Sequence, residues 1–304
     1  MRDLEKYKGI IPAFYACYDE QGEVSPERVQ KLAKYYLEKG VKGLYVGGSS
    51  GECIYQTVSE RKLVLENVMA AVGGKMTIIA HIASPSTRDS VALAKHAESL
   101  GVDALAAIPP IYFVLPEDAI EDYWASMAEA TNLDFIIYNI PQTTGYGLTV
   151  ELLNKMLTRE QVVGVKNSSM PVMDINNFKL NSHREIVVFN GPDEQFVGGR
   201  TMGADGGIGG TYGVMPEAYL KADQLIKENK LAEALELQYA INQIIFKMVS
   251  CDGNLYDVMK KILALDGMEI GKARLPLPQI TEADLPIIEE ARRMIHDLLA
   301  KIAV

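Results

Sequence analysis

The strongest constraint on the fold is a rhythm of eight short apolar segments that alternate with amphipathic segments. Short, nearly continuous apolar runs are typical of strands in a parallel sheet that is covered on both faces. The segments between them have helical periodicity and helix-start signals at Ser25-Pro26, Ser59-Glu60 and Thr149. Eight strand–helix units predict a closed (β/α)8 TIM barrel of around 250 residues. The predicted strands are residues 9–17, 43–48, 77–82, 104–110, 135–141, 162–168, 186–192 and 206–212.

Helical periodicity continues after the eighth unit, which ends near Asn229. We therefore divide the chain into a barrel, 1–229, and a C-terminal three-helix extension, 230–304. An open doubly wound sheet is the competing fold; it usually has fewer strands and requires a reversal of strand order that a sequence does not reveal. The predicted helices of the extension are residues 231–250, 255–265 and 281–302, with a proline-containing linker at 273–279.

Composition excludes several classes of protein. The chain has 304 residues, of which 48% are hydrophobic and 23% charged, so it can build a large core without disulfides. A formal net charge of -10 argues against a nucleic-acid partner. Three widely spaced cysteines, Cys17, Cys53 and Cys251, indicate a reducing compartment. The charged N-terminus and the lack of an apolar run of roughly 20 residues predict a cytoplasmic protein that has no membrane partner.

One predicted strand ends in a lysine, Lys166, in the sequence VVGVKNSS. Ammonium groups are rarely buried without a partner. One interpretation is a lysine at the end of a strand whose amine reaches water. The other is a desolvated amine, because burial lowers the pKa of an amine from roughly 10.4 and leaves a nucleophile that forms Schiff bases with carbonyl compounds. Active sites of barrels lie at the carboxyl ends of the strands, so the other strand ends bear on this choice.

Reactive or ligand-binding groups also follow the second, fourth and fifth strands. The glycine-rich turn GGSSGE places backbone N–H groups and hydroxyls at Gly48, Ser49 and Ser50, which suits a carboxylate; a capped tight turn is the alternative. Tyr138 can carry protons at the end of the fifth strand, or simply plug the barrel. Tyr112 lies in a loop after two prolines and is a lid, a subunit contact or plain loop packing.

The seventh and eighth strands end in acidic and glycine-rich sequences. Gly191, Asp193 and Glu194 belong to NGPDE, where the carboxylates can bind a polyol or can merely begin a helix. The eighth strand, DGGIGGTY, includes Gly210 and gives room for a phosphate, a bulky substrate or close backbone packing. The four histidines are scattered without ligand spacing, so we expect no metal site.

Four motifs in order, GGSSGE, YNIP, GVK and GGIGGTY, together resemble the pyruvate-dependent class I aldolases, the family of dihydrodipicolinate synthase and N-acetylneuraminate lyase. The resemblance covers essentially the whole chain. It implies a barrel with three extra helices, a homotetramer, and a reaction that needs no metal or organic cofactor. It also implies that Lys166 forms a Schiff base with a keto carbon and that Tyr138 moves protons. Ser49 and Ser50 would hold the carboxylate and join a proton relay with Tyr112, which would come from a neighbouring subunit.

Within this family, three features favour the sialic-acid lyase branch. Thr143 stands two residues after YNIP, where the synthase branch has an arginine that grips a carboxylate, and threonine has no cationic fork. The carboxylates of Asp193 and Glu194 match those that bind the hydroxyls of the sugar tail, because each sugar O–H is a donor. Ser168 supplies the hydroxyl that follows the lysine in that branch.

Two departures concern the sugar tail: Gly210 stands where the lyase motif often has serine, and Pro192 stands where a larger side chain is common. The resemblance implies a small-molecule substrate and reversible retro-aldol cleavage of N-acetylneuraminate to N-acetylmannosamine and pyruvate. Another pyruvate aldolase, either dihydrodipicolinate synthase or a 2-keto-3-deoxy sugar acid aldolase, is the alternative enzyme. A non-catalytic ligand-binding barrel is the alternative from a different class.

Overall fold

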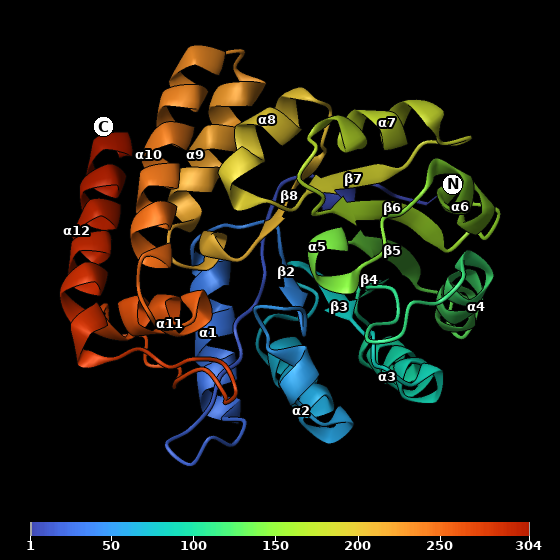
Figure 1. The fold of residues 1–304 in the computed structure, drawn as a ribbon, viewed down its shortest axis with the longest axis horizontal. Coiled ribbons are helices and arrows are strands. Elements are labelled where there is room, and N and C mark those ends of the chain that lie inside the picture. The colour runs from blue at the N-terminus through green and yellow to red at the C-terminus, as the bar shows by residue number, and fades with distance from the viewer. Residues whose placement is uncertain (1, 304) are drawn as a thin grey trace.

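The computed structural model describes residues 2–303 and contains one sheet of eight parallel strands. Neighbouring strands follow the order β1-β8-β7-β6-β5-β4-β3-β2. The two remaining edges meet through a parallel bridge between Ala13 and Tyr45, where the N–H of Phe14 donates to the Tyr45 carbonyl at 2.9 Å. The sheet is thus a nearly closed barrel surrounded by helices (Figure 1), as the eightfold rhythm predicts.

The strands are shorter than the apolar runs that predict them. The first predicted strand includes residues 13–17, but the backbone N–H groups of this buried segment donate to three different neighbours, Gly209, Tyr45 and Ser50, rather than to one adjacent strand. The end of the eighth run is also not strand, because residues Thr211–Gly213 form a 3-10 helix. The strands are β1 (Ile10–Pro12), β2 (Gly43–Val46), β3 (Thr77–His81), β4 (Ala104–Ala107), β5 (Asp134–Asn139), β6 (Val162–Asn167), β7 (Val187–Asn190) and β8 (Gly206–Gly209).

Helices cover the outside of the barrel, and their starts follow the capping rules. The Ser25 and Thr149 hydroxyls accept from backbone N–H groups three residues later. The predicted start at Ser59 is wrong, since Thr57 caps that helix in a capping box with Glu60. The helices are α1 (Pro26–Glu38), α2 (Val58–Val72), α3 (Thr87–Leu100), α4 (Glu117–Ala128), α5 (Pro141–Thr144), α6 (Val150–Met156), α7 (Met173–Asn181), α8 (Phe196–Thr201) and α9 (Pro216–Lys227).

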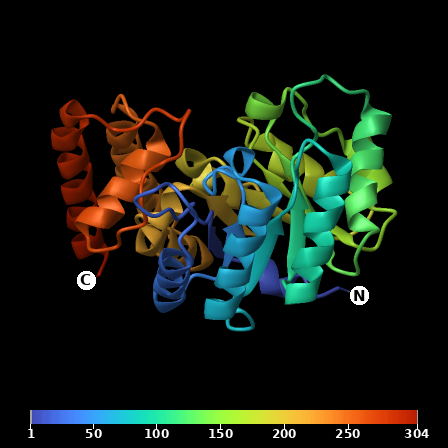
Figure 2. The same ribbon diagram turned by 90° about the horizontal axis from the view of Figure 1, so that it is seen from below.

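Three further α-helices follow the barrel, α10 (Leu231–Val249), α11 (Leu255–Leu265) and α12 (Leu285–Ile302). They lie together at one side of the barrel (Figure 2), where α10 packs on α9 and α12. The last helix begins later than predicted, because Glu282–Asp284 form a 3-10 turn before it. Within residues 2–303, none of the helices has the length and apolar character needed to cross a membrane.

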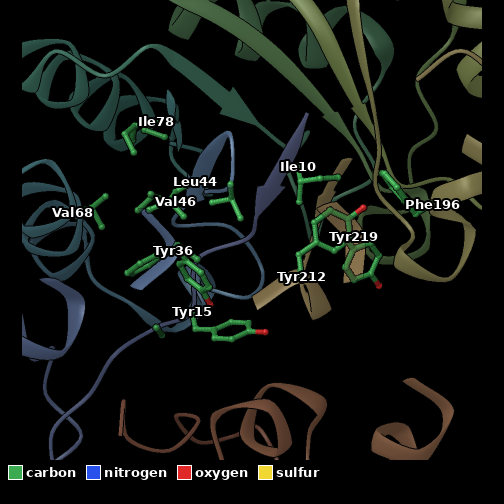
Figure 3. Packing of buried hydrophobic residues seen from close by; sticks show 14 of the residues in the cluster. Ile10, Tyr15, Tyr36, Leu44, Val46, Val68, Ile78, Phe196, Tyr212 and Tyr219 are labelled. Atoms are coloured by element: carbon green, nitrogen blue, oxygen red, sulfur yellow. The ribbon is translucent and has the colours of Figure 1, made fainter. Parts of the chain in front are cut away.

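Two apolar layers hold the barrel. The outer layer lies between sheet and helices, where Leu44, Val46 and Ile78 of the strands pack against Tyr36 and Val68 of the helices (Figure 3). The inner layer fills the lumen. Because side chains alternate along a strand, strands β1 to β7 contribute to both layers, whereas the single side chain of β8, Ile208, lies in the lumen. This alternation points Tyr45, Tyr138 and Lys166 into the barrel.

A buried ion pair joins the extension to the barrel. Nζ of Lys260 on α11 lies 2.6 Å from Oε1 of Glu52, which ends the glycine-rich turn, and the two side chains are 1% and 0% exposed. The same amine donates to the Lys272 carbonyl, and Oε2 of Glu52 accepts from the N–H of Arg274. Losing one partner of such a pair leaves a buried, uncompensated charge at a cost of roughly 3–5 kcal/mol. The glycine-rich turn is therefore anchored on α11.

Candidate active site

A cavity of about 400 Å³ opens at the rim formed by the carboxyl ends of the strands. This volume is in the range of small-molecule sites, roughly 300–1,000 Å³. The cavity brings together most of the residues that the sequence predicts for the site, although they are scattered over more than 160 positions from first to last. The predicted residues that line it are Ser49, Ser50, Tyr138, Lys166, Ser168, Gly191, Asp193, Glu194 and Gly210.

Lys166 is buried at the base of this cavity, with 4% of its surface exposed. It pairs with Tyr138 in the register between β5 and β6, so both side chains enter the lumen at the same level. Nζ lies over the Tyr138 ring, 3.9 Å from its centroid, and over the Tyr45 ring at 4.4 Å. Among residues 2–303, no carboxylate lies within 4.0 Å of this amine. The side chain of Lys166 is thus enclosed by the barrel and does not extend into open solvent.

The glycine-rich turn after β2 requires glycine at two positions, Gly47 and Gly48. Gly47 has a left-handed φ of 76°, which glycine adopts without strain. A Cβ at Gly48 would lie only 2.7 Å from Cε1 of Tyr45, so this position requires glycine. The turn then presents Ser49 and Ser50 to the cavity, and the Ser50 carbonyl accepts from the N–H of Ala16. Gly48 itself supports the turn against the Tyr45 ring and is not among the cavity-lining residues.

His81 fixes the entry to this turn. Nδ1 lies 2.8 Å from the Gly47 carbonyl, and Nε2 faces the N–H of Ile108 at 3.4 Å. Burial, followed by the charge of Arg61, lowers the pKa of His81 to about 3. The imidazole is therefore neutral, donates through Nδ1 and accepts through Nε2. It is a support for the turn rather than a proton carrier near neutral pH.

The ends of β5 and β6 are tied by a buried amide network. Nδ2 of Asn139 donates to Oδ1 of Asn167 at 2.8 Å, and Nδ2 of Asn167 donates to the Ser169 hydroxyl at 2.9 Å. The N–H of Ser168 donates to the Asn139 carbonyl. Its hydroxyl lies over Gly191, where a Cβ would come within 1.9 Å of Oγ. Glycine at 191 thus keeps the Ser168 hydroxyl in place at the edge of the cavity.

Asp193 and Glu194 differ in environment. Glu194 is exposed, whereas Asp193 is buried and its Oδ2 accepts from the N–H and the hydroxyl of Thr211 at 2.6 and 2.7 Å. Burial raises the pKa of Asp193 to about 6, although the two bonds from Thr211 oppose this change. Oδ1 sits against Gly209, where a Cβ would lie 1.9 Å from it. Oδ2 of Asp193 is therefore bonded to Thr211, whereas Oδ1 is available for a ligand in the cavity that Asp193 lines.

Tyr112 lies outside the cavity. It is in the loop between β4 and α4, is 92% exposed and has a left-handed φ of 83°. Its ring packs edge-on against Phe113, and Phe113 and Val114 are also exposed. A run of three exposed hydrophobic side chains beside the rim of the barrel is unusual for a free surface. Within one chain, the structure does not bring Tyr112 together with the other predicted residues.

Several lining residues were missed from the sequence. Leu255, Tyr256 and Met259 come from α11, so the extension forms part of the cavity wall. Burial raises the pKa of Tyr256, whose side chain lies near Ser50. Helical periodicity identifies α11 but does not indicate that one of its faces meets the barrel rim. The described residues contain no group of three or more His, Cys, Asp or Glu side chains that could hold a metal ion.

Comparison with known proteins identifies the family. The chain matches the dihydrodipicolinate synthetase family over residues 6–294. The chain belongs to this family. It is 59% identical to N-acetylneuraminate lyase of Mediterraneibacter gnavus over 303 residues, which cover 99% of this chain and 96% of that protein. It is 33% identical to N-acetylneuraminate lyase 2 of Escherichia coli, with coverage of 98% and 99%.

A solved structure gives the same result. The structure of a Ruminococcus gnavus sialic acid aldolase, a catalytic lysine mutant, has a TM-score of 0.98 and 58% sequence identity. The match covers 99% of this chain and 100% of that chain. The resemblance inferred from the four ordered motifs is thereby confirmed, and so is the barrel fold.

The environment of Asp193 predicts a pH-dependent stability. Its pKa in the folded protein, about 6, lies above the ordinary value of 3.8, so the folded state binds this proton more tightly than the unfolded chain does. The contribution of Asp193 to the free energy of unfolding is therefore fully present below pH 4 and is lost as the pH rises through 6. The difference between the two values corresponds to about 3 kcal/mol. We expect Asp193→Asn, measured by urea unfolding between pH 4 and 8, to abolish this loss.

Glu194→Gln is the matched control, because it removes the neighbouring, exposed carboxylate. It should leave the pH dependence of unfolding unchanged. If the curves for Asp193→Asn and the parent protein stay parallel from pH 4 to 8, the burial of Asp193 does not carry this energy.

Proposed function

We propose that the protein is a class I aldolase that cleaves N-acetylneuraminate reversibly into N-acetylmannosamine and pyruvate. The observation that carries this proposal is the buried amine of Lys166 at the base of the cavity, which it shares with Tyr138 and with Ser49 and Ser50 of the glycine-rich turn, hereafter the serine turn. A water-exposed lysine at a strand end would not support it. The high identity to a relative named N-acetylneuraminate lyase supports the choice of substrate.

In this proposal, the serine turn binds the C1 carboxylate of the open-chain sugar acid. Backbone N–H groups and the hydroxyls of Ser49 and Ser50 are suited to an anion. The carboxylate then places the C2 ketone beside Nζ of Lys166. Once deprotonated, the amine of Lys166 attacks C2, the carbonyl oxygen leaves as water after taking up protons, and a protonated imine remains on Nζ.

The protonated imine acts as the electron sink for cleavage of the C3–C4 bond. Tyr138 takes the proton of the C4 hydroxyl as the bond breaks, so C4 becomes the aldehyde of N-acetylmannosamine and the electron pair passes to C3. The resulting enamine is protonated at C3 and hydrolysed to pyruvate, which frees Lys166. Ser49, Ser50 and Tyr112 would pass the proton on.

The opposite wall of the cavity would bind the sugar tail. Three groups there can accept hydrogen bonds from sugar hydroxyls: Oδ1 of Asp193, the exposed carboxylate of Glu194 and the hydroxyl of Ser168. The Ser168 hydroxyl can also donate one. Thr143 also lines the cavity, where it offers no cationic fork for a second carboxylate. This favours a polyol tail over the dicarboxylic product of a synthase.

Tyr112 takes part only if a second copy of the chain brings it to the cavity. The exposed Tyr112, Phe113 and Val114 favour a homotetramer in which this loop is covered. We expect sedimentation equilibrium to give a mass of four chains, and Tyr112→Asp to reduce that mass by placing a charge in the contact. A parent protein that sediments as a single chain would contradict the assembly and the role of Tyr112.

Chemical trapping tests the Schiff base directly. Borohydride reduces an imine to a stable amine, so pyruvate with borohydride should inactivate the protein and add mass at Lys166 in a peptide map. Lys179, which is paired with Asp205 outside the cavity, is the matched internal control and should not be labelled. Labelling at another lysine, or at none, would remove the proposed mechanism.

The role of Tyr138 is tested by removing only its hydroxyl. Tyr138→Phe should lower the kcat of cleavage by roughly 10²–10⁴-fold, the usual worth of a positioned proton carrier. Trapping with pyruvate should persist, because the ring beside Lys166 is retained. A kcat close to that of the parent protein would show that another group moves the proton.

A further inference from the structure

The amine of Lys166 lies between two aromatic faces, and only one of them has a place in the proposed proton transfers. We infer that Tyr45 is a positioning residue whose ring face stabilises the positive charge that Nζ of Lys166 carries in the protonated imine. This inference rests on the proposed Schiff-base chemistry and adds a residue to it. Tyr45 touches the reaction only through Lys166.

The geometry of Tyr45 suits this role. Nζ of Lys166 lies 4.4 Å from the centroid of the Tyr45 ring, within the roughly 6 Å over which a cation is attracted to a ring face. The Tyr138 ring meets Tyr45 edge-on, with centroids 5.8 Å apart and planes at 83°. The two rings therefore form two walls of one niche around the amine. Among residues 2–303, no other aromatic ring has Nζ of Lys166 over its face.

The Tyr45 ring is held rigidly. It is fully buried, lies 6.0 Å from the His81 ring and is packed against Gly48, where no Cβ would fit. Any tilt of the ring would displace the serine turn or His81. A ring that is fixed in this way does not need to reorganise when charge develops on Nζ, which is the condition for electrostatic stabilisation.

The two rings are the nearest groups of the protein that can stabilise charge on Nζ of Lys166. Amine, ketone and one proton give the protonated imine and water, so a net positive charge remains on Nζ in a buried site. No carboxylate among residues 2–303 lies within 4.0 Å of the amine. Uncompensated buried charge is costly, whereas a desolvated cation over an aromatic face is stabilised. The ring faces therefore add to the stabilisation that the neighbouring C1 carboxylate of the substrate gives to the imine.

The hydroxyl of Tyr45 makes no hydrogen bond within residues 2–303 that would account for a tyrosine at this position. It is also buried. A buried hydroxyl without a partner destabilises the fold, so its removal is nearly neutral or favourable. The ring and the hydroxyl of Tyr45 can therefore be separated by experiment.

The first test compares Tyr45→Phe with Tyr45→Leu. Trapping by borohydride is measured by intact mass as a function of pyruvate concentration, which gives the concentration for half-maximal labelling. Tyr45→Leu removes the ring and should raise this concentration by roughly 3- to 30-fold, the range expected for a desolvated cation–π contact. Tyr45→Phe keeps the ring and should rescue trapping to within about twofold of the parent protein.

The second test keeps the shape of the side chain constant. Phenylalanines with one, two and three fluorine atoms, incorporated at position 45, have progressively less electron density on the ring face. The pyruvate concentration for half-maximal trapping should rise stepwise along this series. A purely structural role of Tyr45 would not produce such a series. The control is the same substitution at Phe189, a buried lumen residue that is the β7 partner of Lys166.

The outcomes separate the two proposals. If the parent protein is not labelled by pyruvate and borohydride, the aldolase chemistry itself fails. If the parent is labelled but Tyr45→Leu and the fluorinated series behave like Tyr45→Phe, the role of the ring is overturned while the chemistry stands. If Tyr45→Leu does not fold, the fluorinated series alone decides, and a flat series overturns the inference. An equal response at Phe189 would overturn it as well.

Discussion

The single direction of the eight strands is the constraint on which the rest of the molecule depends. Because all strands run parallel, their carboxyl ends meet at one rim, and residues far apart in the chain face one cavity. The alternation of side chains along each strand then decides which residues enter the lumen. Lys166 and Tyr138 point inward at the same level because they are register partners on β5 and β6. The proposed chemistry requires both conditions: the two residues must be register partners, and both side chains must point into the lumen.

The extension completes the site rather than standing apart from it. Helix α11 supplies Leu255, Tyr256 and Met259 to the cavity wall, and its Lys260 is paired with Glu52 at the end of the serine turn. Removing either partner would leave a buried, unpaired charge, so the pair ties α11 to this turn. The boundary near residue 229 that the sequence suggests is therefore a boundary of the barrel pattern. The functional unit, as we interpret it, crosses that boundary.

The sequence predicts the architecture well because its main signal is periodicity. Each of the eight apolar runs contains a strand, and Tyr138 and Lys166 end two consecutive predicted strands, which are neighbours in the barrel. The errors occur where an apolar run continues beyond the ladder. Residues 13–17 are as apolar as a strand, but their backbone donors go to three different partners. Periodicity measures burial, and it does not show which neighbour satisfies a backbone group.

The sequence does not reveal several features of the site for a similar reason. Tyr45 precedes the serine turn by a few positions, and the alternation of side chains in GLYV places it in the lumen. Its contact with the amine of Lys166, however, depends on closure of the barrel between β1 and β2. The separate environments of Asp193 and Glu194 depend on Thr211, which lies 18 residues beyond Asp193. Tyr112 lies outside the cavity of its own chain, so the role proposed for it would require a second chain. Tertiary placement of this kind leaves no local signal in the sequence.

The most direct test of the central claim is turnover of the proposed substrate. Purified protein is incubated with N-acetylneuraminate, and pyruvate release is followed by coupling to lactate dehydrogenase, in parallel with Lys166→Ala. We predict sustained release by the parent protein and none by the variant. Absence of release by the parent protein, or equal release by Lys166→Ala, would contradict cleavage through a Schiff base at Lys166.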